Sequence, residues 1–319
     1  MRLLVVVFLL ALAGCATFKP SGVRPVLNAE NWVSHDGKTM PCQVWPVPAG
    51  MTPRGVVIAV HGLSGAKSDF WYLGQELPKR GYTVYAYDLR GQGNDPVAAE
   101  RGDISGEQAW KRDLATFHGL VKRKQPKTPV FWYGESLGSL ISLHTAADLL
   151  GNRSDPQGII LASPVAGLRM TVGGFQRFVL ETAAKLSPRT RYSLGELAGV
   201  DENKIQVTSA STHGSQMAVT PHHINAFSLR LLTTIGRMLD ANTDAAHELK
   251  MPVLFVASPN DVLSSADQIQ ALFAEVRSRS KKLLWYTRSY HLLLHDVQHA
   301  EVVNDVTKWL DRQIKTQQR

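Results

Sequence analysis

Short apolar segments alternate with amphipathic segments along most of the chain, and this alternation limits the folds that the sequence can adopt. Apolar runs such as RGVVIAVHG (54–62) and YTVYAYDLRG (82–91) have the length of buried strands. Apolar residues at helical spacing follow, as in residues 107–124. Alternating strands and helices form βαβ units, whose right-handed crossovers place helices on both faces of a parallel sheet. The sequence therefore predicts an α/β fold with a mostly parallel sheet.

The alternation stops between residues 168 and 250. This section is mostly helical in pattern, with a polar stretch near residues 201–215. Connections of this length inside a compact domain are uncommon unless they form a unit of their own. We therefore expect a helical cap at 168–250 over one end of the sheet, between a first core segment, 31–167, and a second one, 251–319.

The expected cap carries an apolar stripe. Phe175, Phe178, Val179 and Leu180 recur within the helical segment GGFQRFVLETAAKL. Their side chains face an acyl chain or pack the cap onto the body. Periodicity does not separate these two interpretations.

The first fifteen residues have the pattern of a targeting segment. Arg2 precedes an apolar run that is shorter than the roughly 20 residues that a membrane-spanning helix needs. The run ends in LAGC (12–15), which resembles the lipobox of bacterial lipoproteins. The resemblance implies a signal peptide at 1–15, lipid attachment at Cys15 and a tether at 16–30.

The same resemblance implies a location. Ala16 follows the cysteine in place of an aspartate, which is similar to lipoproteins sorted to the outer membrane, here facing the periplasm. The alternative is an ordinary secretory signal with a coincidental cysteine. If Cys15 carries lipid, Cys42 is the only other cysteine and no internal disulfide is expected.

Composition narrows the classes of partner and cofactor. Hydrophobic residues make up 44% and charged residues 19%, which is typical of a globular protein. The net charge is +8, but its densest run, Lys122–Lys124, suits a solvated helix end, so no nucleic-acid partner is expected. The sequence has neither a metal-ligand cluster nor a dinucleotide glycine fingerprint, so we expect no metal and no cofactor.

The stretch PVFWYGESLGSLISLH (129–144) reads as a strand that passes directly into a helix. Gly134, Ser136 and Gly138 form the Gly-x-Ser-x-Gly pattern between the two elements. In such an elbow the serine is lifted clear of the sheet edge at the helix N-terminus, and its neighbours two residues away must be small. The pattern predicts a nucleophilic serine; a purely structural turn is the alternative.

A serine hydroxyl needs a base and an orienting carboxylate, which follow it in this chain order in hydrolases with such an elbow. Asp261 comes directly after the predicted strand MPVLFVAS, at the turn Pro259–Asn260. His291 follows the last predicted strand, in the loop before the final helix. We therefore predict Asp261 as the acid and His291 as the base, with His295 as the alternative base.

An oxyanion hole needs two backbone amides near the serine. One belongs to the residue after the nucleophile, Leu137. The other comes from the loop after the first central strand, VHGLSG (60–65), in which Leu63 is the expected donor.

Five segments in this order resemble the monoacylglycerol lipase-like, or serine aminopeptidase-like, branch of the α/β-hydrolase superfamily. They are VHGLSG, YDLRGQGND, GESLGS, SPNDVLS and SYHLLLHD. The resemblance covers about residues 56–310. It implies an α/β-hydrolase fold, a Ser136–Asp261–His291 triad and a helical cap over an acyl pocket.

The sequence departs from that branch near the site. Gln92 replaces the second histidine of its Arg-Gly-His-Gly segment, and Asn94–Asp95 replaces the serine that follows. Within the elbow, Glu135 stands where histidine is usual and Ser139 where a third glycine is usual. Glu135 either brings a carboxylate near the site or is a buried, hydrogen-bonded support. No triad residue is lost.

The predicted chemistry is hydrolysis of carboxylic esters through an acyl-enzyme intermediate. A lipid-anchored esterase would meet monoacylglycerols and lysophospholipids, so the expected substrate is such a lipid or a small ester. An aminopeptidase or thioesterase with the same triad is one alternative. A peptidase would need cap carboxylates near the substrate amine, for which Glu181 and Glu196 are available. A catalytically idle envelope binding protein is the other alternative.

Overall fold

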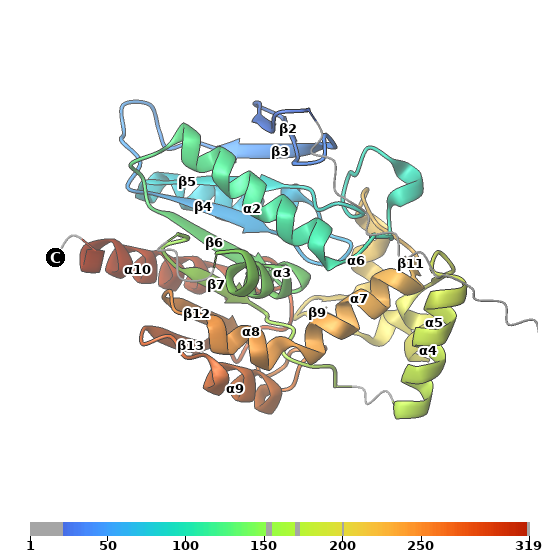
Figure 1. Cartoon of the computed structure of the whole chain (residues 1–319). Coiled ribbons are helices and arrows are strands. Elements are labelled where there is room, and N and C mark those ends of the chain that lie inside the picture. The colour runs from blue at the N-terminus through green and yellow to red at the C-terminus, as the bar shows by residue number, and fades with distance from the viewer. Residues whose placement is uncertain (1–21, 151–154, 170–172, 200, 318–319) are drawn as a thin grey trace, which may run out of the picture.

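A single large sheet forms the centre of the computed structural model, which describes residues 22–150, 155–169, 173–199 and 201–317 (Figure 1). Its nine strands are ordered β1-β2-β3-β5-β4-β6-β7-β12-β13. Neighbours from β5 to β13 are parallel, which confirms the predicted mostly parallel sheet. The strands are β1 (Val26–Leu27), β2 (Asn31–Val33), β3 (Thr39–Trp45), β4 (Gly55–Val60), β5 (Tyr82–Tyr87), β6 (Val130–Glu135), β7 (Ile159–Ala162), β12 (Val253–Ala257) and β13 (Lys281–Trp285).

Helices cover both faces of the sheet, as the alternation predicts. Successive side chains of a strand point to opposite faces. In β4, Val56, Ile58 and Val60 therefore join one core, whereas Val57 and Ala59 join the other. The first core packs against α2 (Glu107–Lys124), α3 (Leu137–Thr145), α8 (Asn242–Glu248) and α9 (Ala266–Glu275). The second packs against α1 (Trp71–Glu76) and α10 (His299–Gln317).

The edge of the sheet nearest the N-terminus differs from the prediction. β1, β2 and β3 pair antiparallel, and β3 also runs antiparallel to β5. Val26 pairs with Val33, so the residues expected as the end of a tether already belong to the sheet. β1 and β2, with two and three residues, are too short to show a periodic pattern. β3 has seven residues but includes Pro41, which counts against a strand in the sequence. Cys15 and the lipobox lie outside the described residues.

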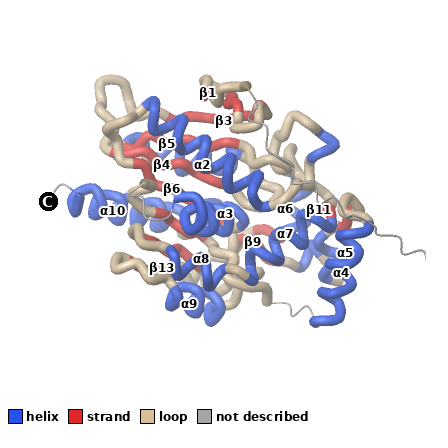
Figure 2. Tube along the Cα trace, viewed as in Figure 1, coloured by secondary structure: helices blue, strands red, loops and turns tan. Residues whose placement is uncertain are grey.

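The segment inserted after β7 lies beyond the carboxyl ends of the central strands (Figure 1). The prediction of a mostly helical segment omitted two small antiparallel strand pairs, β8–β11 and β9–β10, visible as short strands in Figure 2. The elements are α4 (Gly174–Leu186), β8 (Arg191–Tyr192), α5 (Leu194–Ala198), β9 (Gln206–Thr208), β10 (Ser211–Thr212), α6 (His213–Val219), β11 (Phe227–Ser228) and α7 (Leu229–Asp240).

The return to the body comes earlier than the expected boundary at 250. Helix α8, from Asn242 to Glu248, packs against α3 and α9. Ala245 and Ala246 of this helix belong to the sheet core. We therefore use the name "insertion" below for residues 173–241. No helix within the described ranges is long and apolar enough to cross a membrane.

Candidate active site

The predicted elbow joins β6 to α3 without an intervening loop. Ser136 has φ 53° and ψ −118°, a backbone conformation that non-glycine residues rarely adopt. A Cβ at Gly138 would lie 1.9 Å from the Val60 carbonyl oxygen, and one at Gly134 would lie 2.4 Å from the Gly138 oxygen. These approaches confirm that both flanking positions must be glycine. The sequence folds this way because strand, glycine-flanked serine and helix follow one another directly.

The structure brings Ser136, His291 and Asp261 together in one hydrogen-bonded chain. Ser136 Oγ lies 3.0 Å from His291 Nε2, and His291 Nδ1 lies 2.8 Å from Asp261 Oδ2. The serine follows β6, the aspartate follows β12, and the histidine follows β13. Because these strands are parallel, their carboxyl ends meet at one edge of the sheet. His295 is in the 3₁₀ helix at Leu293–His295 and forms no hydrogen bond with Ser136 among the described residues.

Burial and their mutual hydrogen bond set the protonation states of His291 and Asp261. Burial alone would lower the pKa of His291, but the charge of Asp261 and its hydrogen bond raise it above the usual value. Burial alone would raise the pKa of Asp261, but His291 and the amides of Leu263 and Ser264 lower it. Asp261 is therefore a carboxylate that stabilises a protonated imidazole at His291.

The loop that carries Leu63 passes directly against the nucleophile. A Cβ at Gly62 would lie 3.1 Å from the Ser136 Cβ. Within the described part of the chain, neither the Leu63 amide nor the Leu137 amide donates a backbone hydrogen bond, so both predicted oxyanion donors are free. Leu137 is the first residue of α3, where an amide has no partner inside its helix.

His61 orients the Leu63 amide, a role that the sequence did not reveal. Its Nε2 accepts from the Leu89 amide at 2.9 Å, so Nδ1 carries the proton and donates to the Gly62 carbonyl at 2.8 Å. Burial lowers the pKa of His61, which keeps the ring neutral. The Gly62 carbonyl and the Leu63 amide belong to one trans peptide and point in opposite directions. Holding the oxygen therefore directs the N–H.

Three residues that depart from the family pattern also form hydrogen bonds with the backbone of the site loops. Gln92 is fully buried and its Oε1 accepts from the Ser64 amide at 2.8 Å. Ser139 donates to the Ser136 carbonyl at 2.6 Å. Asp95 accepts from the Gly91 amide at 2.7 Å. These side chains fix the loops on which the site depends.

Glu135 is a buried carboxyl group directly before the nucleophile. Only 4% of the residue is exposed, and within the described residues its Oε1 has no hydrogen-bond partner. Burial, and then repulsion from Asp69, raise the pKa of Glu135 to about 7, while His291 opposes the shift. One of the two alternatives that the sequence leaves open for Glu135 is a buried, hydrogen-bonded support. The residue is buried as that alternative requires, but its Oε1 lacks the expected hydrogen bond within the described residues.

Two further serines hold the histidine loop and were missed in the sequence. Ser163 Oγ donates to the His291 carbonyl, and Ser258 Oγ donates to the Ser289 carbonyl. Each serine directly follows a strand, β7 or β12. The signal was present, since Ala-Ser-Pro occurs after both strands, at 162–164 and at 257–259.

The structure shows the exposure of the apolar stripe in the insertion and the partners of the two carboxylates considered for a substrate amine. Phe178 and Val179 are 66% and 47% exposed, so neither side chain is enclosed by the body, while Leu180 is partly buried. The Phe175 side chain lies outside the described part of the structure. Glu181 accepts from Arg177 Nε at 3.1 Å, and Glu196 accepts from the Ser193 amide at 2.8 Å. Both carboxylates proposed for a substrate amine are thus engaged within their own helices.

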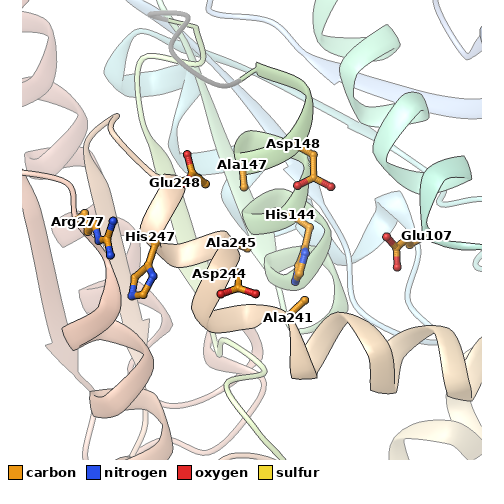
Figure 3. Close-up of a pocket in the computed structure, with 10 residues that line it drawn as sticks. All are labelled: Glu107, His144, Ala147, Asp148, Ala241, Asp244, Ala245, His247, Glu248 and Arg277. Atoms are coloured by element: carbon orange, nitrogen blue, oxygen red, sulfur yellow. The ribbon is translucent and has the colours of Figure 1, made fainter.

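A cavity of about 380 Å³ lies away from the triad, between α2, α3 and α8 (Figure 3). Glu107 and Asp148 at its wall both pair with Lys111, and His247 pairs with Glu275. Among the residues that the structure describes, no group of three or more His, Cys, Asp or Glu side chains is arranged to hold a metal ion. The lining residues are Glu107, His144, Ala147, Asp148, Ala241, Asp244, Ala245, His247, Glu248 and Arg277.

Comparison with known proteins finds relatives that cover most of the chain. The chain is 25% identical over 303 residues to the monoglyceride lipase of Rattus norvegicus, covering 91% of this chain and 92% of the relative. It is 24% identical over 265 residues to the monoacylglycerol lipase of Mycolicibacterium smegmatis, covering 81% and 88%.

Among solved structures, a soluble variant of the Saccharomyces cerevisiae monoglyceride lipase in complex with a substrate analogue superposes with a TM-score of 0.74. The identity is 22%, with 93% of this chain and 98% of that chain covered, so the likeness establishes the α/β-hydrolase fold. The hydrolase family described as "Serine aminopeptidase, S33" matches residues 51–298. The match spans most of the chain, which therefore belongs to that family of α/β-hydrolases.

Proposed function

We propose that the protein is a serine hydrolase that cleaves carboxylic esters of the monoacylglycerol or lysophospholipid kind. The observation that carries this proposal is the chain of contacts from Ser136 through His291 to Asp261, at 3.0 and 2.8 Å. These three side chains lie at the carboxyl ends of the central strands, on the side of the sheet where the insertion lies. Relatives that cover most of the chain are monoglyceride lipases.

The geometry supports a two-step mechanism. His291 Nε2 takes the proton of Ser136 Oγ as the oxygen attacks the ester carbonyl, and Asp261 stabilises the resulting imidazolium. The free amides of Leu63 and Leu137 then hold the oxyanion. His291 gives its proton to the leaving alcohol and later activates the water that releases the acyl group.

The surroundings favour an ester over a peptide substrate. An aminopeptidase binds a charged amine, yet Glu181 and Glu196 already accept hydrogen bonds within the insertion. The exposed Phe178 and Val179 are instead compatible with lipid at the surface of the insertion. A thioesterase would use the same triad, and a binding protein without catalysis would not require a free oxyanion pair.

The test compares the full-length chain in detergent with its Ser136→Ala variant. Substrates are p-nitrophenyl esters of graded chain length, a monoacylglycerol, a lysophospholipid, an acyl thioester and an aminoacyl-nitroanilide. We expect turnover of the two lipids, and a loss of at least about 10⁴-fold in kcat on replacing Ser136, with an unchanged melting temperature.

Each other outcome contradicts the proposal in a distinct way. Serine-dependent cleavage of the nitroanilide alone would assign a peptidase, and preference for the thioester would assign a thioesterase. Activity that persists in Ser136→Ala would remove Ser136 as the nucleophile. If the unmodified chain turned over none of the substrates, a binding function would replace the enzymatic one.

We also propose that the chain is anchored by lipid at Cys15, in the outer membrane of a bacterial envelope and facing the periplasm. The support is the sequence alone, an apolar run followed by Leu12-Ala13-Gly14-Cys15 and Ala16. A single acyl chain binds a membrane only marginally, but the cysteine of the lipoproteins that this pattern resembles is diacylated, and two acyl chains are enough for stable anchoring.

Replacement of Cys15 by serine tests this anchor. In bacteria fed labelled fatty acid, we expect label in the unmodified protein and none in Cys15→Ser, with Cys42→Ser as the matched control that keeps its label. Label on Cys15→Ser would refute the anchor. Recovery of the labelled protein in the inner-membrane fraction would refute the proposed location.

A further inference from the structure

One segment of the insertion is bonded directly to the loop that presents the Leu63 amide. The Ile224 amide donates to Ser64 Oγ at 2.9 Å, and His223 Nδ1 lies 3.3 Å from the same oxygen. Ser64 and Ile224 are both buried. The bond joins residues 160 apart in the sequence, one in the body and one in the insertion.

Ser64 has a backbone conformation that needs such support. Its φ is +59°, in the left-handed region that favours glycine. A strained residue of this kind persists where the surrounding contacts over-determine it, and such residues gather at active sites. The contacts here come from two sides, because the Ser64 amide donates to Gln92 of the body while its hydroxyl accepts from Ile224.

A second contact joins the same two regions. His222 Nε2 lies 3.4 Å from Asp69 Oδ1, and Asp69 Oδ2 accepts from the Ala66 amide at 2.9 Å. Burial alone would raise the pKa of Asp69, but the hydrogen bonds from His222 and from the Ala66 amide, together with the nearby histidine charges, lower it. Segment 222–224 therefore contacts Ser64, next to Leu63, and Asp69, in the 3₁₀ helix Lys67–Phe70 that follows the loop.

We propose that Ser64 is a positioning residue that couples the seating of insertion segment 222–224 to the orientation of the Leu63 amide. This inference rests on the proposed function, in which Leu63 holds the oxyanion. With the segment seated, both sides of Ser64 are fixed and the adjacent amide faces the site. When the segment moves away, the Ser64 hydroxyl loses its insertion partners and the loop relaxes from its strained conformation.

Two substitutions separate this role from a need for the backbone conformation alone. Ser64→Gly removes the hydroxyl but suits φ +59°, whereas Ser64→Ala removes the hydroxyl and keeps the unfavourable conformation. If the hydroxyl bond matters, both variants should lose about 10- to 100-fold in kcat with KM changed less than about twofold, because a displaced donor weakens only the transition state. Ser193→Ala, which deletes a capping hydroxyl elsewhere in the insertion, is the matched control and should keep its kcat.

The other results overturn the proposal. Full activity in Ser64→Gly with a loss in Ser64→Ala would show that only the backbone conformation matters. A loss confined to KM would assign Ser64 to substrate binding. Rates within about twofold of the unmodified protein in both variants would show that the insertion does not act through this residue.

Hydrogen exchange measures the coupling without any substrate. In Ser64→Ala we expect amide exchange to rise about 10-fold or more in residues 61–66 and in residues 222–226 together, and not elsewhere in the insertion. Unchanged exchange in 61–66 would refute the coupling. A protein that turns over no ester but shows the joint rise would refute the proposed function and retain the coupling.

Discussion

The sheet body and the insertion differ in how completely they bury their side chains. Every residue of β4, β5, β6 and β12 is buried. In the insertion, by contrast, helix α4 exposes Phe178, Val179 and Leu186, the last to 83%. Two hydrophobic cores hold each central strand from both faces, whereas α4 is packed mainly against α7.

This difference assigns separate tasks to the two regions. Ser136, Asp261 and His291 all follow strands of the body, so close packing fixes their geometry. The insertion supplies none of the three, and it reaches the site through contacts with loops, such as that of Ile224 with Ser64. The body thus carries the three triad residues, and the insertion, whose side chains are less completely buried, contacts the loop beside them.

Replacing histidines of the two regions should give the largest contrast. His291→Ala removes the base and is expected to lower kcat by about 10⁴- to 10⁶-fold. His213→Ala, in the insertion, and His295→Ala, four residues beyond His291, should each lower kcat by less than about tenfold, because neither side chain hydrogen-bonds to Ser136 or Asp261 in the described part of the chain. Steady-state kinetics on a p-nitrophenyl ester measure all three. A loss in His295→Ala as large as that in His291→Ala would reassign the base.

Replacing one phenylalanine in each region compares their packing directly. Phe131 is fully buried in β6 and contacts Trp309, so Phe131→Ala should lower the free energy of unfolding by about 3 to 5 kcal/mol. Phe178→Ala removes a side chain that is mostly exposed and should change it by less than about 0.5 kcal/mol. Urea denaturation measures both. Equal losses would mean that the insertion is packed as tightly as the body.

The body also contains a buried carboxyl group, that of Glu135, whose ionised form is disfavoured by burial. The pKa of Glu135 is about 7 in the folded protein, against an ordinary value of 4.5. The folded state therefore holds the proton more tightly, and stability is lost as the pH rises from about 4.5 to 7. Glu135→Gln removes this loss, so its stability relative to the unmodified protein should rise by about 3 kcal/mol between pH 4 and pH 8.

Urea denaturation at the two pH values measures this change, and Glu181→Gln in the insertion is the matched control. The Glu181 side chain is 42% exposed and pairs with Arg177 at the surface, so its replacement should leave the pH dependence nearly unchanged. A pH-independent difference for Glu135→Gln would show that the carboxyl group is hydrated in the folded protein.

The sequence predicted the parts of the site that depend on local pattern. A strand, a glycine-flanked serine and a helix follow each other within sixteen residues, so the elbow was visible at Ser136. Asp261 and His291 were found by their places after predicted strands. The antiparallel edge strands β1 and β2 were missed because two or three residues show no periodicity, and β3 because Pro41 lies within it. Ser163 and Ser258 were missed although the repeated Ala-Ser-Pro marked both.

What the sequence by itself determined is the parallel sheet and the chain order of the three triad residues, because residue periodicity and short glycine-containing turns are local properties. Only the tertiary structure decided that His61 holds the Gly62 carbonyl, that Glu135 lacks a partner for Oε1, and that Ile224 meets Ser64. These depend on burial and on hydrogen bonds whose direction is set by packing. The contact between Ile224 and Ser64 joins residues 160 apart, and neither segment has a sequence pattern that indicates it, so it can be identified only in the folded structure.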